Sequence, residues 1–191
     1  FSMQELIDAF SLERVSKSGA RFQPEKAKWF NAQYMHHKSD AELAALYQPI
    51  LREHGIEVSD ETAGRAAGIM KERATFITDL WELTSFFFVA PKEYEEKQTR
   101  KYWKGDNPAR LREVREVLAA IDDFSLENTE RIVHGWIEEK GYPMGQIMNT
   151  LRLALVGAGK GPGMYDITSF IGKEETLRRI DALLANLKPV E

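Results

Sequence analysis

Residues 39–55, SDAELAALYQPILREHG, indicate most clearly what kind of fold this chain adopts. Ser39 and Glu42 form a capping box, in which the two residues satisfy each other's backbone N–H groups at the start of a helix. Gly55 stands where such a helix would end. Apolar side chains recur between these points at helical spacing, at Leu43, Leu46, Tyr47, Ile50 and Leu51.

The same pattern recurs on both sides of this stretch. Pro24, Pro108 and Pro143 stand at first-turn positions, where proline is favoured. No alternating pattern typical of a strand exceeds about four residues. The sequence therefore predicts an all-α fold, with domain seams expected near 36–38 and 93–108. Helices are expected over 3–10, 24–34, 39–55, 59–70, 75–88, 107–121, 125–141, 143–155, 163–172 and 173–187.

Composition narrows the class of protein. The 191 residues contain no cysteine, which excludes a disulfide framework and thiolate metal sites and fits a reducing cytosol. No apolar run approaches the roughly 20 residues of a membrane span, and no secretion signal is visible. A cytoplasmic protein without a membrane partner is expected. Its opening, Phe1-Ser2-Met3, already belongs to an amphipathic pattern, as expected of a piece of a longer protein.

The net charge of −4 argues against indiscriminate nucleic-acid binding but allows a local basic site. Residues 140–165 contain three basic residues, Lys140, Arg152 and Lys160, and no acid. Within this stretch, the glycine-rich segment 157–163 lacks the Lys-Ser/Thr pair and the preceding strand of a nucleotide-binding loop. It is either a turn whose N–H groups approach RNA or a flexible turn between helices.

No catalytic or metal site is predicted. His36 and His37 diverge on a helix, and His54 and His134 stand alone. Paired carboxylates such as Glu95-Glu96 fit solvated faces, and nothing places an acid against a base.

A few basic and aromatic residues are better candidates for RNA contacts. Lys26 and Trp29 are three apart on a predicted helix and would share a face for RNA, unless Trp29 belongs to the core. Arg73 follows a helix end. Arg152 lies on an apolar helix and needs either an acid partner or an RNA group.

Arg14-Val-Ser-Lys-Ser resembles the lysine loop with which class I aminoacyl-tRNA synthetases hold ATP phosphates. That chemistry requires a nucleotide-binding α/β half, and nothing after Arg14 reads as βαβ. The continuation, residues 20–31, instead resembles the segment just beyond the catalytic half of bacterial glutamyl-tRNA synthetases. Later blocks resemble the helical part of the same enzymes, in order and over essentially the whole chain. These blocks are 140–142, 145–146, 151–157, 161–163, 171–174 and 177–180.

The resemblance implies the C-terminal portion of a bacterial glutamate–tRNA ligase. Residues 1–37 would end a helical region that contacts the tRNA stem, and 38–90 and 91–191 would form two subdomains of an α-helical cage that binds the anticodon. The partner would be tRNA(Glu), not DNA, and the protein a monomer. No cofactor is expected in this part. The parent would use ATP and Mg in a Rossmann-type half, and whether it also charges tRNA(Gln) is left open.

Residue roles follow from the same resemblance. Arg73 matches an arginine that faces the third anticodon base, which is C in glutamate anticodons and G in glutamine anticodons. Arg152 matches one on the anticodon-facing helix, and His134 falls where some relatives have another arginine. Gly161 and Met164 lie in the loop that would approach the bases. Arg14, Lys26 and Trp29 would contact the tRNA body. A stand-alone helical protein-interaction module is the alternative.

Overall fold

The computed structural model describes residues 1–15, 19 and 21–190, and within them it contains helices and no strand longer than a single bridge. The all-α prediction is confirmed. None of the described helices is long and apolar enough to cross a lipid bilayer. The elements are α1 Met3–Ala9, the 3-10 turn η1 Leu12–Arg14, α2 Pro24–His37, α3 Asp40–Glu53, α4 Asp60–Met70, the 3-10 turn η2 Lys71–Arg73, α5 Asp79–Phe88, α6 Glu96–Tyr102, α7 Asn107–Ala119, α8 Leu126–Lys140, α9 Met144–Val156 and α10 Met164–Asn186.

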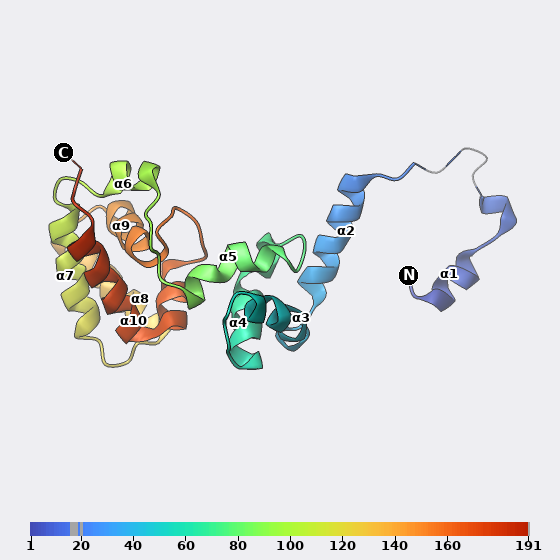
Figure 1. The fold of residues 1–191 in the computed structure, drawn as a ribbon, viewed down its shortest axis with the longest axis horizontal. Helices are drawn as coiled ribbons and strands as arrows, with labels where there is room; N and C mark the ends of the chain where they lie inside the picture. Colours follow the sequence, from blue (N-terminus) through green and yellow to red (C-terminus); the bar gives the residue numbers. More distant parts are fainter. Residues whose placement is uncertain (16–18, 20, 191) are drawn as a thin grey trace.

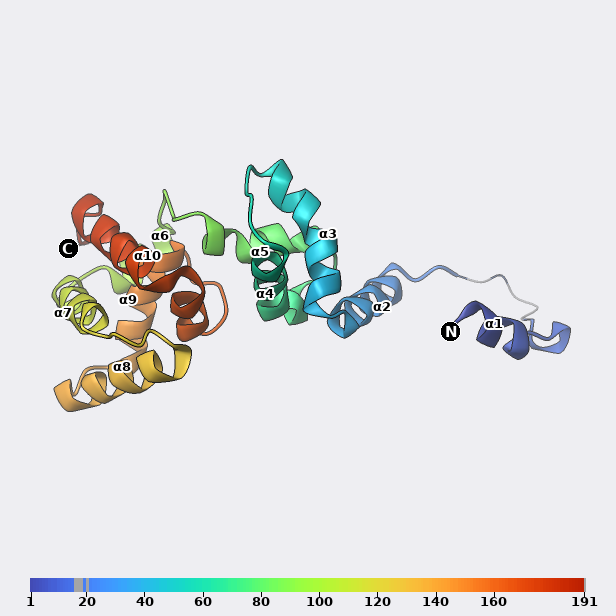
Figure 2. The same ribbon diagram turned by 90° about the horizontal axis from the view of Figure 1, so that it is seen from below.

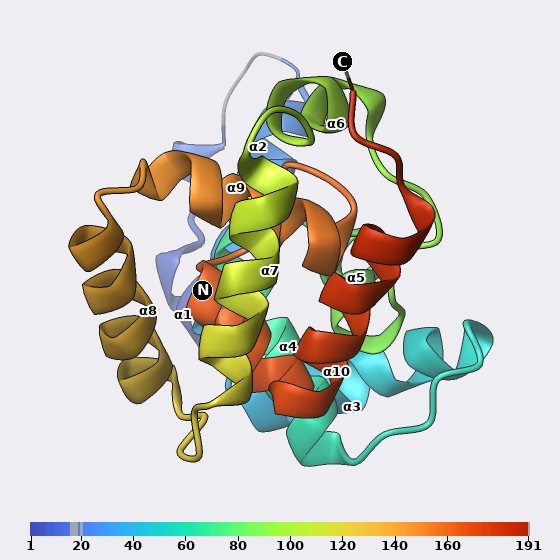
Figure 3. The ribbon, with the colours of Figure 1, turned by 90° about the vertical axis from the view of Figure 1, so that its left-hand side faces the viewer.

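The helices follow one another along an elongated molecule (Figures 1 and 2). Helices α6 to α10 form one end, α3 to α5 the middle, and α2 and then α1 extend towards the other end. In the end-on view of Figure 3, α7, α8 and α10 lie beside one another. Helix α10 packs on α7, α8 and α9, and α6 packs on α9. Helix α1 buries none of its residues, so the apolar face predicted for it is exposed.

Two clusters of buried side chains hold these helices together. The larger lies among α7 to α10 and includes Phe86 and Phe87 of α5 and Met70 of α4. The smaller lies between α3, α4 and the start of α5, with Met35 of α2 at its edge. Helices α4 and α5 contribute to both clusters and therefore join them. The division at residues 38–90 and 91–191 stays a prediction.

Local signals account for several helix boundaries. Ser39 and Glu42 make the complete capping box of α3, and Ser59 caps α4 by accepting from the backbone N–H of Thr62. Gly141 and Gly157 end α8 and α9 in the left-handed conformation. A helix pair separated at Gly172 was also predicted, and α10 has non-helical φ and ψ at that residue.

Two predicted boundaries were wrong, and one helix was not predicted. Helix α5 begins at Asp79, not at Thr75, because the Asp79 carboxylate accepts from the backbone N–H groups of Thr75 and Phe76 and holds the preceding residues in a turn. Ile121 is buried but lies beyond the end of α7. Helix α6 was missed altogether, because EKQTRKY has no apolar periodicity and contributes no buried residue.

Candidate functional site

Arg73 and Arg152 converge on the glycine-rich loop between α9 and α10. Nη1 of Arg73 donates to the carbonyl oxygen of Gly161 at 2.7 Å. Arg152 donates to the carbonyl oxygens of Lys160 at 3.1 Å and Pro162 at 2.8 Å. Three successive carbonyls of the loop are therefore held by two guanidinium groups that are far apart in sequence.

Gly161 allows this close approach. Its φ is 116°, a conformation that favours glycine. A Cβ atom at this position would lie 3.1 Å from Nη1 of Arg152 and 3.4 Å from Cζ of Phe86. The loop is therefore packed against the arginines. Of the two alternatives for residues 157–163, these contacts do not favour the flexible turn between helices.

The two arginines are not neutralised within the described chain. Neither forms an ion pair with an acid there, so the acid partner considered for Arg152 is replaced by backbone carbonyls. Burial lowers the pKa of the Arg152 guanidinium, and the positive charge of Arg73 lowers it further. Two neighbouring cations that no acid of the described residues pairs with favour an anion or an array of hydrogen-bond acceptors.

Other basic groups of the acid-free stretch do find acids. The Lys140 ammonium lies 3.7 Å from the Glu113 carboxylate, and that of Lys160 lies 3.8 Å from the Glu82 carboxylate. Of the three basic residues in this acid-free stretch, only Arg152 has no acidic partner among the described residues.

Helix α2 and the turn before α5 fix the short η2 segment that carries Arg73. The Asn31 side-chain amide donates to the carbonyl oxygen of Thr75, and Nζ of Lys71 donates to that of Lys38 at 3.1 Å. Nδ1 of His36 lies 3.6 Å from the Glu72 carboxylate. These supporting residues were missed, since nothing in the sequence relates α2 to residues 71–75.

Arg179 is a second residue that sequence reasoning missed. It is 2% exposed and donates to the carbonyl oxygens of Phe86 at 2.6 Å and Leu155 at 2.8 Å, and to Glu175 at 2.7 Å. Phe86 and Leu155 belong to the last turns of α5 and α9, where unpaired carbonyls and the helix dipole favour a cation. Arg179 thus joins the ends of both helices beneath the loop. The spacing of Glu175 and Arg179, four apart on a helix, was the available signal.

The remaining predicted anticodon residues lie near α10 but differ in exposure. The ring of His134, on α8, lies edge-on to that of Tyr165, with 5.4 Å between the ring centres. Met164 begins α10 and is buried in the larger core, so its side chain supports the loop from within.

The predicted tRNA-body residues lie apart from the loop. Trp29 is 57% exposed on α2, edge-on to Phe30, and so is not a core residue in this structure. The Lys26 ammonium lies 5.9 Å from the ring centre of the same phenylalanine. Arg14, in η1, donates to the carbonyl oxygen of Ala9 at 3.3 Å. Lys17, which completes the string resembling the ATP loop, lies outside the described residues.

No group of three or more potential metal ligands occurs in the described part of the chain. The two arginines at the loop offer hydrogen-bond donors and positive charge, which suit the binding of an acceptor-rich or anionic ligand.

Comparisons with known proteins give a consistent result. The family described as "Anticodon binding domain" matches residues 42–184. The chain is 55% identical over 187 residues to the glutamate–tRNA ligase of Phocaeicola vulgatus and 46% identical to that of Flavobacterium johnsoniae, covering 98% of this chain and 37% of each relative. A crystal structure of a glutamate tRNA ligase from Elizabethkingia meningosepticum superimposes with a TM-score of 0.93 at 42% identity, over 98% of this chain and 37% of that one. The chain thus spans little more than a third of the length of these relatives.

Proposed function

Because the chain belongs to the anticodon-binding domain family, we propose that it recognises the anticodon of a tRNA as the C-terminal part of a glutamate–tRNA ligase. The similarity to glutamate–tRNA ligases over almost its whole length supports this proposal. Nothing in the comparisons supports the alternative of a stand-alone protein-interaction module.

The observation that carries the proposal is the pair of uncompensated arginines on the loop 160–162. Unpaired bases offer carbonyl oxygens and ring nitrogens, and a guanidinium is all donor. Arg73 is exposed and has donor groups beyond the one that Gly161 accepts. Arg152 is half-buried and mainly shapes the loop, with its charge adding to the attraction for RNA.

The specific tRNA that we propose as the partner is tRNA(Glu). Its third anticodon base is C, where a glutamine tRNA has G. We assign the choice between these bases to Arg73, because a cytosine edge offers acceptors and guanine brings a larger ring and different edge groups. His134 and Gly161 would border the same bases, and the buried Met164 would support the loop from within. Arg14, Lys26 and Trp29 would meet the tRNA body.

The chemistry of the parent ligase would lie in its other part. There glutamate would be joined to tRNA through an adenylate made from ATP, with Mg. The ligase would act in the cytoplasm as a monomer. No residue of this chain is assigned a catalytic role. The chain contributes binding and discrimination.

A binding experiment on the 191-residue chain tests the proposal. We expect tRNA(Glu) to bind, and Arg73→Gln to weaken binding more than Arg112→Gln, which removes an exposed charge from α7. Equal affinity of the unmodified chain for tRNA(Glu) and for a tRNA with an unrelated anticodon would contradict it.

A further inference from the structure

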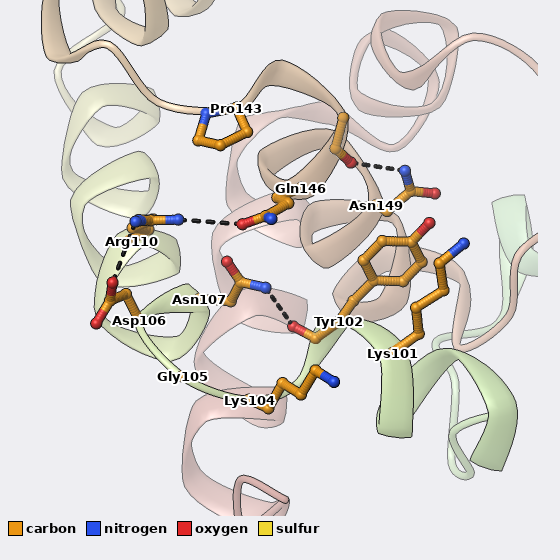
Figure 4. Close-up of a pocket in the computed structure, with 11 residues that line it drawn as sticks. Lys101, Tyr102, Lys104, Gly105, Asp106, Asn107, Arg110, Pro143, Gln146 and Asn149 are labelled. Atoms are coloured by element: carbon orange, nitrogen blue, oxygen red, sulfur yellow. Dashed lines mark hydrogen bonds and ion pairs between the residues drawn. The ribbon is translucent and has the colours of Figure 1, made fainter.

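An open hollow lies where the end of α6 meets the first turns of α7 and α9 (Figure 4). Its volume is about 630 Å³. Lys101 and Lys104 come from α6 and the residues after it, Arg110 comes from α7, and Gln146 and Asn149 come from α9. Three separate elements therefore bring cationic and amide groups around one space that the loop site does not use.

The charges around this hollow do not cancel. Arg110 forms an ion pair with Asp106 at 3.1 Å and donates to the side-chain oxygen of Gln146 at 3.1 Å. Lys101 and Lys104 are exposed, and neither pairs with an acid of the described chain. The nearest aromatic group is Tyr102, whose ring centre lies 5.0 Å from the Lys101 ammonium. Two ammonium groups are thus left to attract an anion.

Backbone groups add to this positive potential. Helices α7 and α9 both begin at the hollow, and neither has a side-chain cap at its N-terminus. The backbone N–H groups of Asn107 and Gln146 already donate, to the carbonyl oxygens of Lys104 at 3.2 Å and Pro143 at 2.9 Å, and Pro108 has no N–H. Those of Ala109, Met144 and Gly145 have no acceptor among the described residues, and the helix dipole favours negative charge beside them. A compact anion with several acceptor oxygens would satisfy both the lysines and the helix ends.

We propose that this hollow binds a phosphate group, supplied by the backbone of the RNA whose bases contact Arg73. The inference rests on the proposed function. Gly145, Asn149 and Arg152 are spaced to lie on one face of α9, and Gly145 precedes Arg152 by about two helical turns, roughly 10 Å along the helix. An RNA strand bound at the arginines needs only to continue along α9 to reach it.

Two measurements on the 191-residue chain test this inference. The first follows the amide NMR signals of Gly105, Gly145 and Gln146 during titration with inorganic phosphate and, separately, with an RNA hairpin of the tRNA(Glu) anticodon arm. We expect both ligands to shift these signals. The second measures RNA affinity at several salt concentrations for Lys101→Gln and Lys104→Gln, with Arg112→Gln, on the opposite face of α7 from Arg110, as the charge-matched control.

Each lysine variant should weaken RNA binding about three- to tenfold at low salt and reduce the salt slope by about 0.7, as expected for one lost phosphate contact. The control should change affinity less than twofold. An equal loss in all three variants overturns the inference, as does an absence of shifts with both ligands. Shifts with phosphate alone, while RNA still binds through Arg73, overturn the RNA assignment and identify a site for a free phosphate compound. If RNA does not bind at all, the proposed function fails, and the phosphate titration still decides whether the hollow accepts an anion.

Discussion

Arg73 and Arg152 hold neighbouring carbonyl oxygens of one loop: Arg73 donates to Gly161 at 2.7 Å, and Arg152 donates to Lys160 and Pro162 at 3.1 and 2.8 Å. Two like charges at one place repel each other, and carbonyl dipoles compensate them only in part. An anionic or acceptor-rich partner would relieve that repulsion. The geometry of the free chain therefore favours RNA binding at this loop.

Arg152→Ala should lower both stability and RNA affinity, because it removes two hydrogen bonds that shape the loop and one charge beside it. We expect a loss of about 1–3 kcal/mol in unfolding free energy, measured by urea denaturation. Arg152→Lys retains the positive charge but loses the planar pair of guanidinium donors. Compared with Arg152→Ala, it should restore the salt dependence of RNA binding but not the full unfolding free energy. Full recovery of both by lysine would contradict a role that depends on two donors.

The candidate site was only partly predictable from the sequence. Arg73, Arg152 and Gly161 were named individually, but their convergence depends on the packing of α4, α5 and α9, which no local pattern encodes. The two tryptophans Trp103 and Trp29 show the same limit: Trp103 is buried, whereas Trp29 is 57% exposed. The capping box of α3 and the left-handed glycines Gly55 and Gly141 were found because they act within a few residues. Helix α6 was missed because its sequence has no apolar periodicity and buries no residue, and its contacts with α9 cannot be read from a local pattern.

Arg179→Ala should destabilise the chain strongly. The side chain is 2% exposed, and its removal leaves the carbonyls of Phe86 and Leu155 without their donor. Each buried carbonyl left without its donor costs about 1–3 kcal/mol. Arg178→Ala is the matched control, because Arg178 also binds Glu175 but its side chain is 60% exposed, and it should cost less than about 1 kcal/mol. Similar losses for both variants in urea denaturation would show that the buried contacts contribute little.

Acid should weaken the folded state through Glu175. Hydrogen bonds from Arg178 and then Arg179 lower the pKa of the Glu175 carboxyl from 4.5 to about 2. Because the folded-state pKa is depressed, the stabilisation is fully present above about pH 4.5 and is lost as the pH falls towards 2. After allowance for solvent screening, we expect about 1 kcal/mol. The pH dependence of unfolding between pH 4.5 and 2 should therefore be shallower in Glu175→Gln, and identical slopes would contradict this assignment.

The 191-residue chain should not form glutamyl-adenylate. Its described residues contain no parallel βαβ unit that could cradle ATP, whatever Arg14-Val-Ser-Lys-Ser resembles. ATP–pyrophosphate exchange with glutamate should be absent. In the full-length ligase, Lys17→Ala should leave adenylate formation unchanged, and a severe loss would show that this string belongs to the catalytic loop.

Arg73→Gln should reduce the choice between tRNAs more than it reduces stability. Arg73 is exposed, so the variant loses its hydrogen bond to Gly161 and one charge but no buried packing. A base contact of this kind is worth about 1–3 kcal/mol, so the preference for C over G at the third anticodon base should fall roughly ten- to hundredfold. The measurement compares charging, by the full-length ligase, of tRNA transcripts that differ only at that base. Lys71→Gln is the control, because it removes a charge and one hydrogen bond to a carbonyl from the same 3-10 turn. If both variants lower charging of the two transcripts equally, Arg73 positions the turn and the base is read by another residue.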